Sequence, residues 1–104
     1  MKKSRTVITW NFLQANHEAD ELKVMADKLQ KYRHDMLIQA EKLSSNWKGD
    51  NATKYIRKIK QEISQLEKIE KQLKTASSTI KTMAKNTYDA DQKSLEIAER
   101  RNYN

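Results

Sequence analysis

Two histidines, His17 and His34, are the side chains of this sequence best suited to bind a metal ion or transfer a proton. They stand seventeen residues apart. On one helix this spacing places them on different faces and several turns apart, so they cannot hold one ion together. Cysteine is absent, which excludes a thiolate metal site and a thiol nucleophile. We therefore expect no metal site and no cofactor.

The remaining residues that could support catalysis are Ser44 and Ser45, which stand among turn-forming residues, and Asp89 and Asp91, which are typical of a solvent-facing helix. With a single glycine the chain has no phosphate-cradling loop. A fold of two helices also offers no deep pocket in which the pKa of a carboxylate would shift. The sequence therefore predicts that the protein is not an enzyme.

The composition favours an all-α fold in a single domain over residues 1–104. Proline is absent and glycine occurs once, so the residues that form the turns of a many-stranded fold are missing. The chain is 34% charged and 37% hydrophobic, as in soluble helical proteins. No segment approaches the roughly 20 apolar residues of a membrane-spanning helix, and no cleavable signal peptide is visible. We therefore expect no membrane insertion.

A seven-residue repeat of apolar side chains predicts a first helix over about residues 10–46, after an extended lead-in over 1–8. Either Thr9 or Asn11 is suited to cap its first turn. One row of the repeat is Leu22, Leu29, Met36 and Leu43; the other is Ala19, Ala26, Ala40 and Trp47, with Arg33 as the misfit. The alanines allow a second helix to approach closely.

A break over residues 47–50 predicts an antiparallel turn into a second helix over about 51–100. Gly49 can adopt the left-handed conformation that ends a helix, and Asp50 or Asn51 can cap the next one. Trp47 is in register with the alanines, so we expect it to be buried against the start of the second helix. The second helix carries one row of Ala52, Ile59, Leu66, Leu73 and Ile80, and another of Ile56 and Ile63 that shifts to Ile69, Ala76, Met83, Ala90 and Ile97.

A hairpin with a single line of contact buries little apolar surface, so we expect a helical protein partner that completes a four-helix bundle. Several apolar residues of the first helix lie outside its main rows and are candidates for that interface. They are Trp10, Phe12, Val24, Met25, Tyr32, Leu37 and Ile38. They either contact the partner or widen the core of the hairpin, and the sequence leaves both interpretations open.

The formal net charge is +7, which indicates an acidic partner. Nucleic-acid binding would require basic residues gathered on one face. Acidic and basic residues instead alternate, with Glu67 and Lys71, and Glu70 and Lys74, in helix-stabilising i, i+4 order. We therefore expect no nucleic-acid binding, and the apolar stripe is better explained as a core than as a membrane-surface helix.

The tripeptide Trp47-Lys48-Gly49, in a turn that joins two long helices of a chain of 104 residues, resembles the ESAT-like WXG family of type VII secretion proteins. The resemblance implies that Trp47 packs at the hairpin tip, that Gly49 shapes the turn, and that two hairpins form a four-helix dimer. It also implies a cytoplasmic protein of Gram-positive bacteria that is exported, if at all, without a cleaved signal peptide.

Similar small proteins bind the helical LXG domain of a secreted toxin and target it to the secretion machinery. The family's export signal is an aromatic residue followed four positions later by an acid; here Tyr88 is followed by Gln92, with Asp91 one residue early. This departure favours a chaperone or co-secreted subunit for an LXG-type toxin. A self-dimerising secreted WXG cargo is the alternative, and a basic nucleic-acid-binding protein is the third hypothesis.

Overall fold

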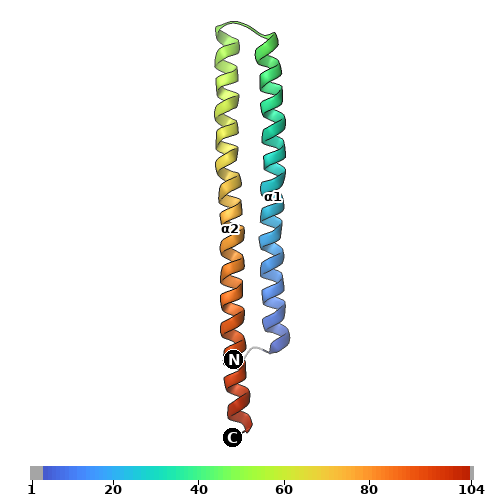
Figure 1. The fold of residues 1–104 in the computed structure, drawn as a ribbon, viewed down its shortest axis with the longest axis vertical. Helices are drawn as coiled ribbons and strands as arrows, with labels where there is room; N and C mark the ends of the chain where they lie inside the picture. The colour runs from blue at the N-terminus through green and yellow to red at the C-terminus, as the bar shows by residue number, and fades with distance from the viewer. Residues whose placement is uncertain (1–3, 104) are drawn as a thin grey trace. The chain divides into compact units, whose positions relative to one another are not determined.

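The protein consists of two long helices in a computed structural model that describes residues 4–103, with side chains for residues 4–101. Helix α1 spans Arg5–Asn46 and helix α2 spans Asp50–Tyr103 (Figure 1), and the described residues contain no strand. The prediction of an all-α chain with two long helices is confirmed.

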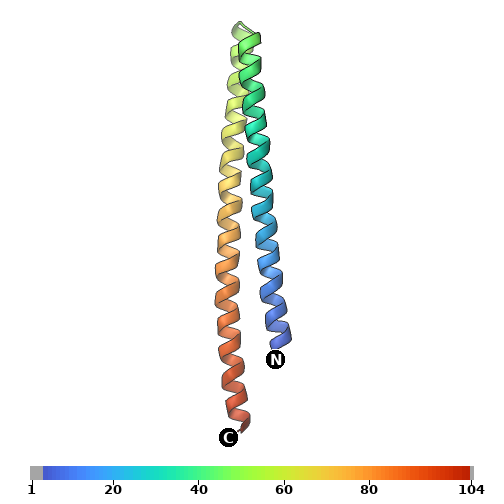
Figure 2. The ribbon, with the colours of Figure 1, turned by 45° about the vertical axis from the view of Figure 1, so that its right-hand side comes forward.

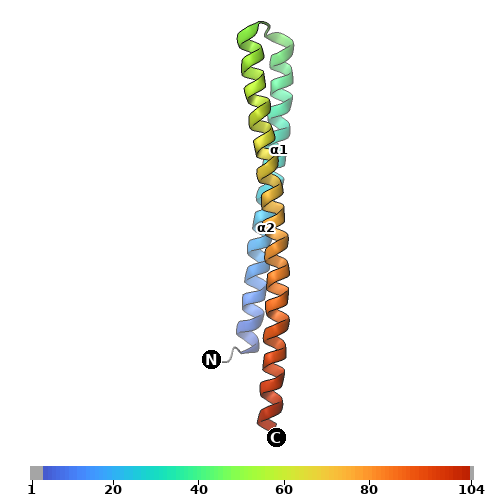
Figure 3. The same ribbon diagram turned by 90° about the vertical axis from the view of Figure 1, so that its left-hand side faces the viewer.

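The contacts of the chain divide it into two compact units. The turn unit is Lys23–Lys74, and the terminal unit is Met1–Leu22 together with Thr75–Asn104. Within the turn unit, the green end of α1 and the yellow-green start of α2 lie side by side in every view (Figures 1, 2 and 3). Within the terminal unit, the blue start of α1 lies beside the orange and red part of α2. The single domain predicted over residues 1–104 stays a prediction.

Helix α1 begins at Arg5, before the start predicted near residue 10. Ser4 caps it, because its Oγ accepts a hydrogen bond of 3.2 Å from the backbone N–H of Val7. Ile8 is 2% exposed, so the first turn of the helix buries one more apolar side chain, which stabilises this early start. The predicted lead-in is therefore wrong for residues 5–8, and residues 1–3 lie outside the described part of the chain.

The turn consists of residues 47–49, one residue fewer than predicted. Gly49 has a φ of +114°, a conformation that side-chain-bearing residues rarely adopt. Its carbonyl oxygen accepts 3.0 Å and 3.1 Å hydrogen bonds from the backbone N–H and the hydroxyl of Thr53. Gly49 therefore occupies the cap position expected of Asp50 or Asn51, and Asp50 is the first residue of α2, where its charge suits the helix dipole.

The line of residues through which the two helices contact each other, here called the seam, is narrow on α1. Ala19, Ala26 and Ala40 are 0 to 2% exposed, whereas Leu29 and Met36 of the neighbouring row are half-buried. Because an alanine adds only a methyl group, the helix backbones approach closely and most of the larger side chains remain partly at the surface. The predicted heptad rows of α1 therefore lie in the seam, except for Trp47, which is 41% exposed.

On α2 the predicted first row is also in the seam, but the predicted shift of the second row is wrong. Ile69 and Met83 are 43% and 62% exposed. The seam instead continues in unchanged register through Glu70 and Ser77, each 4% exposed, and the half-buried Ala84. Ala76 is half-buried, and Ala90 and Ile97 are exposed like Ile69.

A charged pair keeps this register in the turn unit. The Arg33 Nε donates to Glu70 Oε2 at 2.6 Å, and its Nη2 donates to Oε1 at 3.3 Å. These hydrogen bonds raise the pKa of the Arg33 guanidinium above its ordinary value. Arg33, the one charged residue in the alanine row of α1, therefore has a partner across the seam. The expected pair of Glu70 with Lys74 is wrong, because Glu70 binds Arg33 instead.

In the terminal unit, the Ser77 hydroxyl donates a buried hydrogen bond of 2.7 Å to the backbone carbonyl of Ala19. Further along α2 the seam moves to a later residue in each repeat, through the half-buried Tyr88 and Leu95 instead of Thr87 and Ser94. Seven residues of an α-helix fall slightly short of two turns, so a straight helix drifts in this direction. The shift to Ile69 that the sequence predicted moves to an earlier residue of the repeat, which is the opposite direction.

Replacing Ser77 with Ala removes the bond to Ala19 and is expected to lower the free energy of unfolding by about 1 kcal/mol. Ser78→Ala is the matched control, because Ser78 is exposed and the substitution changes only the intrinsic helix propensity. Urea denaturation followed by circular dichroism compares the two variants. Equal unfolding midpoints would show that the Ser77 hydrogen bond does not stabilise the protein.

The contact between Arg33 and Glu70 gives a second prediction. Glu70→Leu alone leaves Arg33 without its partner and lowers the unfolding midpoint, whereas Arg33→Leu combined with Glu70→Leu restores or exceeds the wild-type midpoint. Thermal unfolding of the two single variants and the double variant measures the coupling. Additive effects in the double variant would contradict the contact.

Candidate functional site

The two histidines considered for metal binding both lie on the surface of α1. The exposed His17 Nε2 lies 3.0 Å from the Glu21 carboxylate. His34 is exposed, and no group of three His, Asp or Glu side chains is placed to hold a metal ion among the described residues. No described helix has an apolar segment that could cross a membrane.

Large apolar side chains lie at the surface of both units. Large apolar residues that are 37% to 65% exposed include Val7, Trp10, Leu13, Val24, Met25, Tyr32, Ile38, Trp47, Tyr55, Ile69, Met83 and Ile97.

The turn unit contains a groove between α1 and α2, here called the tip groove. It has a volume of about 440 Å³. Its lining includes Tyr32, Met36 and Leu43 from α1, and Tyr55, Ile59 and Glu62 from α2. Tyr32 is 59% exposed and Tyr55 is 51% exposed. Two half-exposed tyrosines beside aliphatic side chains form the type of surface on which a partner's apolar side chains dock.

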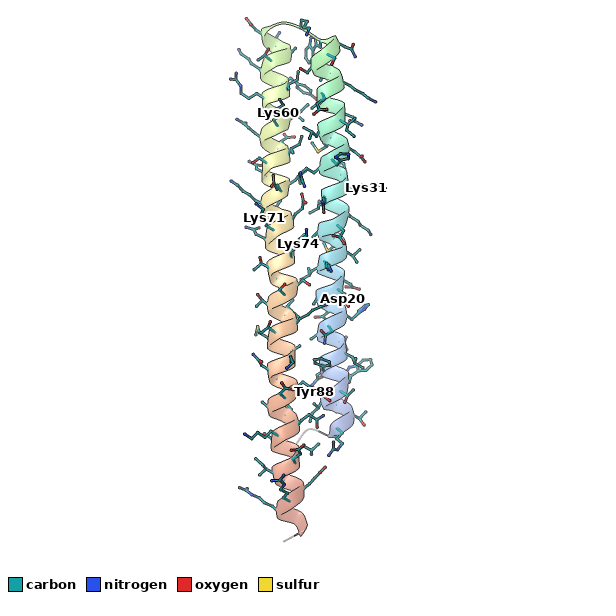
Figure 4. All side chains as sticks on the ribbon, viewed as in Figure 1. Asp20, Lys31, Lys60, Lys71, Lys74 and Tyr88 are labelled. Carbon is teal, nitrogen blue, oxygen red and sulfur yellow. The ribbon has the colours of Figure 1, made fainter. Side chains whose placement is uncertain are left out.

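Lysines occupy a different side of α2 in the same unit. Figure 4 labels Lys60, Lys71 and Lys74, all exposed. On the helix, Lys60 and Lys71 lie about 100° to 180° from the residues of α2 that line the tip groove, and Lys74 lies about 60° to 120° from them. Lys71 Nζ lies 3.8 Å from Glu67, which confirms that expected i, i+4 pair. These three lysines of α2 therefore lie outside the lining of the tip groove.

Trp47 is 41% exposed, so the expectation that it is buried is wrong. Its ring lies beside the Tyr55 ring at the start of α2, with ring centroids 5.8 Å apart and a tilt of 54°. The residue follows the last turn of α1, where no further helical turn covers it. Trp47 therefore contacts α2 as expected but leaves much of its indole at the surface.

The terminal unit holds the predicted export signal. The rings of Phe12 and Tyr88 lie 4.8 Å apart with a tilt of 43°, so the aromatic residue of the signal is packed against α1. Tyr88 and Asp91 both line a groove of about 240 Å³ between the two helices of this unit, and Gln92 is half-buried. Figure 4 shows Tyr88 on the side of α2 that faces α1.

The structure separates the predicted interface residues into two groups. Phe12 and Leu37 are half-buried, and Phe12 belongs to the seam. The other predicted residues are exposed: Trp10, Val24, Met25, Tyr32 and Ile38. Tyr55, Ile69 and Met83 are also exposed, and the sequence did not predict them as interface residues. Tyr55 stands one residue before a seam position, so the repeat alone could have placed it at the edge of the seam.

Comparison with known proteins finds no match: no family model, no curated protein and no solved structure matches this chain.

Because Trp47 is only partly buried, Trp47→Ala is expected to lower the free energy of unfolding by about 2 kcal/mol, below the 3 to 5 kcal/mol of a fully buried Trp. Trp10→Ala is the matched control and should change it by less than about 0.5 kcal/mol, since Trp10 is 65% exposed. Urea denaturation measures both. Equal costs for the two tryptophans would contradict the contact with Tyr55.

Proposed function

We propose that this chain is a small non-enzymatic protein of a type VII secretion system that binds the helical leader of a secreted effector, such as an LXG-domain toxin, and targets it for export. The observation that carries the proposal is the surface of the hairpin. Large apolar side chains remain exposed in both units, so a second pair of helices would bury what the seam leaves at the surface.

The turn supports the same proposal. Trp47 and Gly49 stand at the junction of the two helices, as in the WXG family that the sequence resembles. The positive φ of Gly49 gives the glycine a backbone role, and the contact of Trp47 with Tyr55 gives the tryptophan a packing role at the tip. Both roles are those that the resemblance implies.

The packing of Tyr88 favours a targeting subunit over an independent cargo. The export signal of the family that the sequence resembles pairs an aromatic residue with an acid four positions later, whereas here the Tyr88 ring lies against Phe12 and the acid lies three residues later, at Asp91. We propose that the secretion machinery reads its signal on the partner, and that this chain supplies the helices that complete the bundle.

The proposal predicts a complex of one chain with one toxin leader. Co-expression with the helical N-terminal domain of each LXG-type toxin encoded nearby should give a complex whose mass, by light scattering after size-exclusion chromatography, equals one copy of each. A chain that remains a stably folded monomer at micromolar concentration beside every candidate would contradict the proposal. A gene neighbourhood without a secretion ATPase, a WXG relative or an LXG-type toxin would also contradict it.

Secretion itself distinguishes the targeting subunit from the alternative cargo. Deleting the gene should reduce secretion of the toxin, and both the wild-type chain and Tyr88→Ala should restore it, provided that circular dichroism shows the variant to be helical. Loss of secretion with a folded Tyr88→Ala variant would favour export through this chain's own signal.

A further inference from the structure

We infer that the tip groove of the turn unit binds one amphipathic helix of an acidic protein partner, a helix whose apolar stripe is flanked by Asp and Glu. This inference depends on the proposed function for the premise that the chain acts by helix packing. It adds the surface at which the partner binds and the charge that the partner carries.

The lining of the tip groove combines polar and apolar groups, and its two tyrosines and its aliphatic side chains suit one face of an amphipathic helix. Tyr32 and Tyr55 stand on opposite helices and are both more than half exposed, so each can contact a helix that lies between them. Met36 is flexible and adapts to the side chains of a partner. A groove between two helices that accepts the apolar residues of a third is a common mode of helix recognition.

Lysines flank this groove on both helices. Lys28 precedes Tyr32 by four residues on α1, and Lys58 follows Tyr55 by three residues on α2, so each is a surface neighbour of a groove tyrosine. Lys42 follows another lining residue, Gln39, by three residues. All three lysines are exposed. The acids on the same face are Asp35 and Glu62.

The charge of the protein is concentrated in the unit that holds this groove. The turn unit has 13 Lys and Arg and 7 Asp and Glu, a net charge of +6 out of the +7 of the chain. The terminal unit has a net charge of +1. A second copy that placed its turn unit on the groove would bring another +6 against the first, and its terminal unit offers no acidic excess. An acidic helix is therefore the occupant that the charges favour.

The probes that test this inference are two synthetic helical peptides of about four or five heptads with the same Leu and Ala stripe. One carries Glu at the flanking positions and the other carries Lys. Titrating each labelled peptide with the full chain, by fluorescence anisotropy, should give at least about tenfold tighter binding of the Glu peptide, and added salt should reduce this preference.

Two triple variants with equal charge change locate the site. Lys28→Glu with Lys42→Glu and Lys58→Glu reverses the flanks of the groove and should invert the preference, so that the Lys peptide binds more tightly. Lys60→Glu with Lys71→Glu and Lys74→Glu makes the same charge change on the other side of α2 and should keep the preference for the Glu peptide. Tyr55→Ser should weaken binding of the Glu peptide, whereas Met83→Ser, an exposed apolar residue of the terminal unit, should not.

Equal binding of the two peptides would overturn the acidic partner, and equal effects of the two triple variants would overturn the tip groove as its site. If the free chain dimerises by sedimentation and binds neither peptide, a second copy occupies the groove and the inference fails. Binding as expected without any complex with a toxin leader would leave the groove inference standing while the secretion function fails. If a toxin complex forms and the substitutions at Lys28, Lys42 and Lys58 do not weaken it, the secretion function stands and the groove inference fails.

Discussion

The close approach of α1 and α2 through small side chains is the constraint on which the rest of the structure depends. Ala19, Ala26 and Ala40 bring the backbones together along the seam, and Ala52 does the same from α2. Helices packed this closely leave little room for large residues at the centre of the contact. Most of the larger apolar side chains therefore stand at the edges of the seam or outside it, and among the described residues Ile8 and Ile63 are the large apolar ones that are buried. The exposed surface of the protein is a direct result of how narrow this contact is.

Polar residues of the seam fix which surfaces become exposed. A purely apolar seam would allow α2 to rotate so that Ile69 and Met83 enter the contact. The bidentate contact between Arg33 and Glu70, and the hydrogen bond from Ser77 to the backbone, are lost in that rotated arrangement. A buried charge without its partner is costly, so these contacts select one register even where they add little net stability. Ile69 and Met83 consequently remain available to another protein.

The two units differ in the properties that matter for binding. The turn unit carries nearly all of the net charge and a groove lined by exposed tyrosines. The terminal unit is nearly neutral, and the contact of Phe12 with Tyr88 fills part of the space between its helices. Two of its ion pairs join the two helices, Lys81 with Asp20 at 2.7 Å and Arg5 with Glu99 at 3.2 Å; both are exposed and contribute little stability. The two units therefore differ in net charge and in what fills the space between their helices.

The sequence by itself determined the two helices, the position of the turn and the alanine side of the seam, because heptad spacing and the single glycine are local signals. It did not determine the course of the seam beyond Leu66 or the burial of Trp47. Hydrophobicity alone placed Ile69 in the contact, since a single helix gives no indication that Glu70 meets an arginine thirty-seven residues earlier in the chain. Only the tertiary structure brings these two side chains together, and the energy of satisfying a buried charge then outweighs the gain from burying one more isoleucine. The tip groove and its flanking lysines were likewise decided by tertiary structure, because they combine side chains from both helices.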